Sequence, residues 1–328
     1  MSLKRIELEL SIFTGVQGDA PSTATYNISK TIVSTHTKIN FEVSELVRDY
    51  ITHNFNNDYP SDVVWVKATA NKYDEDDVPY SFDNPITAYY EGLDGWGSYE
   101  DEANPQLSTD GLITANNIYL PENTTGKLPI WRAGVGKYII DSTTTQVTAD
   151  NGNTNQKIEY ITIPVNSSTI KIYALDDTTL KKTITVTNVC EPKFTPYKVT
   201  FINKYGAYED LYFYKKTIES FNVKDEEYKT NIINNSTAAY NTYSTQNQRY
   251  NINAESSLTM NTGFIVEDMT STIEELFLSE NVWIRYNGKT LPVLPQTKTM
   301  QKKTSLNDKL IDYTVNFKFA FNKINNVR

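Results

Sequence analysis

The segment LIDYTVNFKFAF, residues 310–321, alternates apolar and polar side chains with a period of two. Its odd-numbered positions from Ile311 to Phe319 are apolar, whereas the positions between them, from Asp312 to Lys318, are polar. Successive side chains of a strand point to opposite faces, so this pattern predicts a strand with one buried face.

Short segments of the same character recur along the chain and are separated by turn residues such as the hairpin pair Asn287-Gly288. They lie at residues 4–11, 24–32, 36–43, 62–70, 157–165, 169–175, 180–189, 197–203, 211–216, 262–267 and 282–285. Many short strands with turns between them are typical of sandwiches and barrels. The sequence therefore predicts a mainly β fold, with two or three β-sandwich-like or barrel-like domains and a few short helices.

Two short amphipathic helices are expected among the strands. Ser44 is suited to cap a helix that runs to about His53, because its hydroxyl can accept a free backbone N–H. Ser271 and Glu274 form the S-x-x-E capping box of a second helix, whose apolar face begins at Ile273.

Composition shifts divide the chain into three predicted domains, at residues 1–106, 107–196 and 197–328. Pro192 and Pro196 flank the second boundary. The first and third domains each carry one of the short helices. Within the third, residues 226–249 are polar and rich in Asn, Thr and Tyr, which predicts a loose strand pair or an extended arm that orders against a neighbouring subunit.

The composition favours contact with proteins over contact with nucleic acid. The chain has 23 Tyr but only 4 Met and 1 Cys. Tyr suits strands and protein interfaces, although an AT-rich genome would enrich it equally well. The net charge is −9, and the cationic residues are scattered, which disfavours a phosphate-binding surface. The single Cys excludes an internal disulfide.

No catalytic motif is present, so a non-enzymatic protein without metal or cofactor is predicted. The two histidines, His36 and His53, lack the spacing and companions of a zinc site. Neither a nucleophile elbow nor a complete phosphate-binding loop occurs. The N-terminus has no apolar signal segment, and no apolar run is long enough to span a membrane.

Acidic loops between residues 73 and 105 leave alternatives open. Asp94 and Glu100 lie near Trp96 and Tyr99, so a sugar-binding or glycosidase site is the alternative to a solvated surface. The run Asp74–Asp77 supplies oxygen ligands but lacks the glycine and the bidentate glutamate of an EF-hand, so a calcium site is not predicted.

Four segments resemble virion structural proteins of tailed phages that infect Bacteroidetes, including the crAss-like group. They are SELVRDY at 44–50, VVWV at 63–66, FINKYGAYEDLYFYKK at 201–216 and KTSLNDKLIDYTV at 303–315. This resemblance implies a multi-copy ring or sleeve subunit of the neck or tail, such as a portal–tail connector. The alternative is a tail-fibre adaptor or a protein that binds a host glycan receptor.

The expected partners are copies of the chain in a ring and other phage tail or neck proteins. Sequence-specific nucleic-acid binding and membrane insertion are not expected. The expected location is the virion, after synthesis in the host cytoplasm. Aromatic residues in segments that look exposed are the predicted subunit interface: Trp96, Tyr99, Tyr240, Tyr243 and Tyr250.

Overall fold

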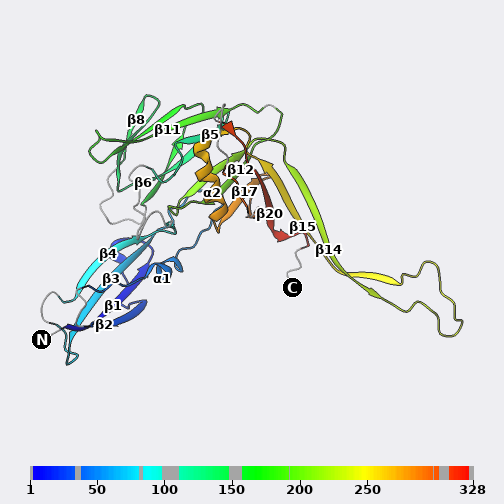
Figure 1. Cartoon of the computed structure of the whole chain (residues 1–328), viewed down its shortest axis with the longest axis horizontal. Coiled ribbons are helices and arrows are strands. Elements are labelled where there is room, and N and C mark those ends of the chain that lie inside the picture. Colours follow the sequence, from blue (N-terminus) through cyan, green and yellow to red (C-terminus); the bar gives the residue numbers. More distant parts are fainter. Residues whose placement is uncertain are drawn as a thin grey trace. The chain divides into compact units, whose positions relative to one another are not determined.

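The computed structural model describes residues 3–33, 38–80, 84–97, 111–147, 157–191, 193–297, 299–302 and 310–324. Half of the chain is strand and 7% is helix, arranged as several largely antiparallel sheets with two short α-helices (Figure 1). The predicted mainly β fold is therefore confirmed, and the arrangement is consistent with several β-sandwich domains.

The chain folds as two compact units. Unit 1 comprises Met1–Cys190, Thr200–Leu211 and Asp268–Asn281, and unit 2 comprises Glu191–Val199, Tyr212–Glu267 and Val282–Arg328. The predicted boundary near residue 106 lies outside the described residues. The predicted boundary near residue 196 falls close to the end of the first segment of unit 1. Two later segments return to unit 1, and the three-domain division stays a prediction.

The first sheet of unit 1 has four antiparallel strands in the order β2-β1-β3-β4. These strands are β1 Leu3–Phe13, β2 Tyr26–Thr31, β3 Val64–Asp74 and β4 Ile86–Gly92. Leu8 and Leu10 of β1 lie on one face and share a buried cluster with Val64 and Val66 of β3. Residues 38–43, predicted to belong to a strand, are irregular and lead into the first helix.

The first helix is shorter than predicted. α1 spans Ser44–Arg48, and Val43 occupies the N-cap position. The Ser44 hydroxyl donates instead to the carboxylate of Glu42. The predicted extension to His53 is wrong, because the helix ends at Arg48. The His53 ring instead bonds to the carboxylates of Asp62 and Asp94, and the segment after Arg48 leaves the helical path to reach them.

The second part of unit 1 contains a five-stranded sheet, β5-β11-β10-β7-β8, and a two-stranded sheet, β6-β9. The strands are β5 Asn117–Pro121, β6 Gly126–Trp131, β7 Val135–Ile140, β8 Thr143–Gln146, β9 Ile158–Ile163, β10 Thr169–Ala174 and β11 Leu180–Val189. Ile170 and Ile172 of the larger sheet and Leu128 and Ile130 of the smaller one are fully buried. Each sheet thus contributes one apolar face to a core.

The returning segments add the second helix to unit 1. α2 spans Thr270–Leu278, directly after the 3-10 turn η3 at Glu267–Met269. The predicted capping box is wrong, because Met269 occupies the N-cap and the Ser271 hydroxyl donates back to the Asp268 carbonyl. The predicted apolar face is confirmed, since Ile273 is fully buried.

Unit 2 is built on a seven-stranded sheet in the order β13-β12-β17-β18-β20-β15-β14, and the boundary between the units falls within β12 and β13. The strands are β12 Tyr197–Ile202, β13 Tyr208–Phe213, β14 Ile218–Lys229, β15 Asn247–Asn261, β17 Val282–Tyr286, β18 Lys289–Pro295 and β20 Thr314–Asn322. β16 Ile265–Val266 pairs with β19 Leu310–Ile311. Val315 and Phe317 are fully buried, which confirms the predicted alternation. Asn287 and Gly288 both have positive φ, as the predicted β17–β18 hairpin requires.

Candidate functional site

The most exposed part of unit 2 is the hairpin formed by β14 and β15. β15 pairs with β20 only from Glu255 to Asn261, whereas its pairing with β14 continues to Asn247. Ala254 and Asn253 still hydrogen-bond to Lys323 and Ile324. Beyond them, Figure 1 shows the two strands leaving the sheet as a ribbon that ends in a loop. All twelve residues of β14 are exposed, as are the first six of β15. We call residues 225–252 the arm.

A β-bulge marks the base of the arm. Lys224 pairs with Asn253 and Glu226 pairs with Tyr250, so β15 carries one extra residue at this point. Asn251 supplies it with a φ of 50°, in the left-handed region that asparagine tolerates better than most residues. Its side-chain amide also donates to the Glu226 carboxylate at 2.9 Å. The bulge therefore sets the direction in which the arm leaves the sheet.

The tip of the arm, residues 230–246, contains no charged residue, although 22% of the whole chain is charged. The tip is closed by a hydrogen bond from the Thr230 N–H to the Gln246 carbonyl. Tyr240 is 63% exposed and Tyr243 is 84% exposed. Exposed Tyr among Asn, Ser and Thr is the composition of surfaces that recognise proteins, where charge is depleted and aromatic rings are enriched.

The structure divides the five predicted interface residues between different places. Tyr240 and Tyr243 lie in the tip. Tyr250 lies on β15 within the arm, and the centroid of its ring is 5.5 Å from that of Tyr228. Trp96 lies in unit 1 and is half-buried. Tyr99 lies outside the described residues. Their role as an interface stays a prediction.

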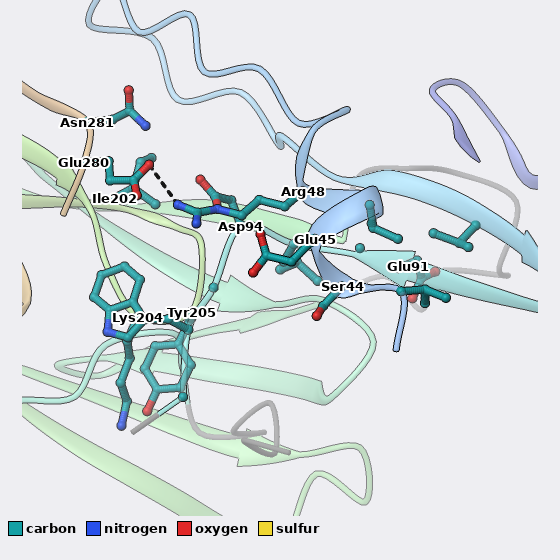
Figure 2. Close-up of a pocket in the computed structure, with 18 of the residues that line it drawn as sticks. Ser44, Glu45, Arg48, Glu91, Asp94, Ile202, Lys204, Tyr205, Glu280 and Asn281 are labelled. Carbon is teal, nitrogen blue, oxygen red and sulfur yellow. Dashed lines mark hydrogen bonds and ion pairs between the residues drawn. The ribbon is translucent and has the colours of Figure 1, made fainter. Parts of the chain in front are cut away.

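Trp96 lines a pocket of about 730 Å³ in unit 1 (Figure 2). The walls come from α1, the end of β4 and the loop after it, the loop at 203–206, and the segment that follows α2. Figure 2 shows the Arg48 side chain reaching from α1 to Glu280, while Lys204 and Tyr205 lie together, away from Ser44.

A chain of charged groups starts at Arg48, Asp94 and Glu280 in the lining of this pocket and continues to His53 and Asp62. Arg48 Nε lies 2.8 Å from one oxygen of Asp94, and Arg48 Nη2 lies 2.8 Å from Glu280. The other oxygen of Asp94 lies 2.8 Å from His53 Nε2, and His53 Nδ1 lies 2.8 Å from Asp62. Burial alone would lower the His53 pKa, but the two carboxylates outweigh it and raise that pKa to about 9. His53 is therefore a buried cation that fixes Asp94.

Close packing of two loops holds Trp96 in place. The backbone N–H of Trp96 donates to the Lys204 carbonyl at 2.8 Å. Gly95 allows this approach, because a Cβ at that position would lie 2.7 Å from the same oxygen. Gly206, with a φ of 76°, lies against the Asp94 backbone from the other loop. This wall of the pocket is thus preformed.

Two other acidic residues singled out in the sequence, Asp74 and Asp77, have partners in the structure. Asp74 accepts the N–H groups of Asp76 and Val78 at 3.0 and 2.9 Å, which closes a turn. Asp77 pairs with Arg5 at 3.0 Å. Among the residues that the structure describes, no group of three or more His, Cys, Asp or Glu is placed to hold a metal ion. Glu100, the predicted companion of Asp94, lies outside those residues.

Two buried carboxyl groups escaped sequence analysis. Glu209 accepts hydrogen bonds from the Asn203 amide at 2.9 Å and the Thr272 hydroxyl at 3.2 Å. Glu275 of α2 accepts from the Thr114 hydroxyl and from the Lys204 N–H. Burial, together with the nearby Glu275, raises the pKa of Glu209 to about 8. No local signal in the sequence marks either residue as buried. Each lies in an amphipathic strand or helix pattern, and such a pattern looks the same when its Glu is exposed.

Comparison with known proteins gives no relative: no family model, curated protein or solved structure matches the chain. Of the helices in the described ranges, none combines the length and the apolar character needed to cross a membrane.

Proposed function

We propose that the chain is a non-enzymatic structural subunit of a tailed-phage virion, present in several copies as a ring or sleeve of the neck or tail. The observation that carries the proposal is the arm, a two-stranded ribbon exposed on both faces with an uncharged, Tyr-rich tip. In the assembled particle the arm contacts a neighbouring subunit. The four segments that resemble phage virion proteins support the same assignment.

The energetics of the arm favour assembly. Ordering the backbone of a residue costs about 1–2 kcal/mol, and an isolated two-stranded hairpin is marginally stable in water. The arm has no apolar core to offset that cost, since its strand residues are exposed on both faces. Burial of the aromatic tip against another subunit supplies the missing free energy.

The charge distribution favours contact through the tip. Each copy carries a net charge of −9, so acidic surfaces of neighbouring copies repel one another. An uncharged tip approaches an acidic neighbour without that penalty. A head-to-tail contact of this kind closes into a ring when the rotation between copies is a fraction of a full turn.

Cryo-electron microscopy of purified particles is the direct test. We expect rings of this chain around the portal or tail axis, with each arm resting on another subunit. A projecting peripheral trimer would instead support the alternative of a fibre adaptor or receptor-binding protein. Absence from the particle would contradict both.

Sedimentation velocity of the purified full chain provides a second test. We expect assembly that increases with concentration and is weakened by Tyr243→Ser at the tip. Tyr89→Ser, at a 38% exposed position of β4, is the matched control and should leave assembly unchanged. Cleavage of host polysaccharide by the purified protein, abolished by Asp94→Asn, would refute the non-enzymatic assignment.

A further inference from the structure

We infer that the pocket lined by α1 and Trp96 binds a neutral saccharide unit. This function goes beyond that of an assembly subunit and does not depend on it. The inference rests on the size of the pocket, its rigid aromatic wall and the balance of its charges.

The pocket has the size and the mixed lining of a small-ligand site. Its volume of about 730 Å³ lies within the usual range of roughly 300–1,000 Å³. Val47, Val66 and Ile202 are buried side chains that line it, and they give it an apolar base. Carboxylate, amide and guanidinium groups stand around that base. A pyranose ring has the matching character, with an apolar face of C–H groups and a rim of hydroxyls.

Trp96 and Tyr205 provide aromatic surface for such a ring. Both line the pocket and both are half-buried, so part of each side chain stays accessible. Their backbones belong to the two loops that pack through Gly95 and Gly206. A platform that is already in place loses little conformational freedom when a ligand stacks on it.

The charges of the lining disfavour anionic ligands. Among the described residues that line the pocket, five are acidic and two are basic: Glu42, Glu45, Glu91, Asp94 and Glu280 against Arg48 and Lys204. Arg48 is also neutralised by Asp94 and Glu280, each at 2.8 Å. A phosphate or a carboxylate would meet net negative charge here. Carboxylate oxygens accept hydrogen bonds from hydroxyl groups, and sugar hydroxyls supply those donors in pairs.

Glu45 is the residue best placed to accept hydroxyl groups. It is exposed at the first turn of α1 and lines the pocket, and no ion pair or hydrogen bond involving its carboxylate occurs among the described residues. Asp94, in contrast, uses both oxygens within the protein, one with Arg48 and one with His53. We therefore assign hydroxyl binding to Glu45 and to the outer oxygen of Glu280, and a supporting role to Asp94.

A glycan array probed with the full chain tests the inference. We expect binding to glycans that end in neutral sugars and none to glycans whose terminal sugar is anionic. Saturation-transfer NMR with the free sugar of the best glycan should then show contact with its ring protons. Spermidine serves as a cationic competitor in the same experiment and should not displace the sugar.

Three variants locate the site. Trp96→Ala should weaken the Kd for the sugar about tenfold or more, and Trp96→Phe should restore much of the binding because it keeps an aromatic ring. Glu45→Gln should weaken binding by a smaller factor, since the amide keeps one acceptor oxygen. Tyr89→Ala, on β4 but outside the lining, is the control and should leave the Kd unchanged.

Absence of binding to every neutral glycan on the array would overturn the inference. So would preferential binding of anionic glycans, displacement by spermidine, or a Kd unaffected by both Trp96→Ala and Glu45→Gln. None of these results bears on assembly, because assembly is measured separately by sedimentation and no residue of the arm lines the pocket. Failure of the saccharide site is therefore distinguishable from failure of the proposed structural role.

Discussion

Replacement of Glu209 by Gln should make the stability of unit 1 less sensitive to pH. The folded protein holds the Glu209 proton up to about pH 8, whereas the unfolded chain releases it near the ordinary value of 4.5. Because the pKa of Glu209 is raised in the folded protein, the stability that its bound proton contributes is fully present below about pH 4.5. This contribution is lost as the pH rises through about 8. Gln carries no proton to lose, which removes the part of the dependence that Glu209 contributes, whereas Glu275, whose pKa burial also raises, keeps its own part.

The magnitude follows from linkage. A difference of one bound proton changes the free energy of unfolding by about 1.4 kcal/mol per pH unit. Because titration of Glu209 is half complete near pH 8, the free energy of unfolding falls by about 2 kcal/mol between pH 6 and pH 8. We expect Glu209→Gln to change stability little at pH 6, where the neutral carboxyl beside Asn203 and Thr272 has a single carbonyl oxygen, as Gln has. At pH 8 we expect the variant to be more stable than the original chain.

Urea unfolding followed by tryptophan fluorescence measures the effect. In a Trp283→Phe background all remaining tryptophans, at positions 65, 96 and 131, belong to unit 1. Glu227→Gln, on the exposed strand β14, is the matched control and should leave the pH dependence unchanged. If Glu209→Gln lowers the free energy of unfolding equally at pH 6 and pH 8, the Glu209 carboxyl is not titrating in the folded state and the reasoning fails.

Three further outcomes are expected. His53→Gln should destabilise unit 1 most at pH 6 and progressively less toward pH 9. The raised pKa of His53 contributes stability that is fully present below about pH 6.5 and is lost as the pH rises through about 9. Urea unfolding midpoints measured between pH 6 and pH 9 check this. Asn251→Val should loosen the base of the arm, because a β-branched residue at a φ of 50° costs about 1–2 kcal/mol, while Asn251→Gly should not; limited proteolysis of residues 225–252 distinguishes them. Gly95→Ala should lower the thermal midpoint, because the added Cβ would meet the Lys204 carbonyl at 2.7 Å, and an unchanged midpoint would show that the loops yield freely.

Local pattern was sufficient to predict many of the strands and the apolar face of α2. The alternation from Ile311 to Phe319 predicted which side chains are buried on β20, and Val315 and Phe317 are indeed inaccessible. Asn287-Gly288 predicted a hairpin that the structure contains. The period of side-chain direction is a property of the strand backbone itself, so such predictions need no knowledge of distant residues.

The candidate sites were only partly predictable. The polar composition of residues 226–249 indicated an arm, and the structure contains a hairpin there that leaves the sheet. Trp96 was singled out for its aromatic ring among acidic residues, but nothing local connected it to Lys204 or to Arg48. Likewise, α1 ends at Arg48 and not near His53, since the His53 ring is held by Asp62 and Asp94.

The sequence by itself therefore determined the strand pattern, the uncharged tip and the absence of any familiar catalytic motif. Only the tertiary structure decided that Glu209 and Glu275 are buried, that His53 is a cation held between two carboxylates, and that the residues lining the pocket come together. The physical reason is that burial and charge pairing depend on segments far apart in the chain. A carboxylate in an amphipathic pattern has the same local signature whether it faces water or an interior held closed by other strands.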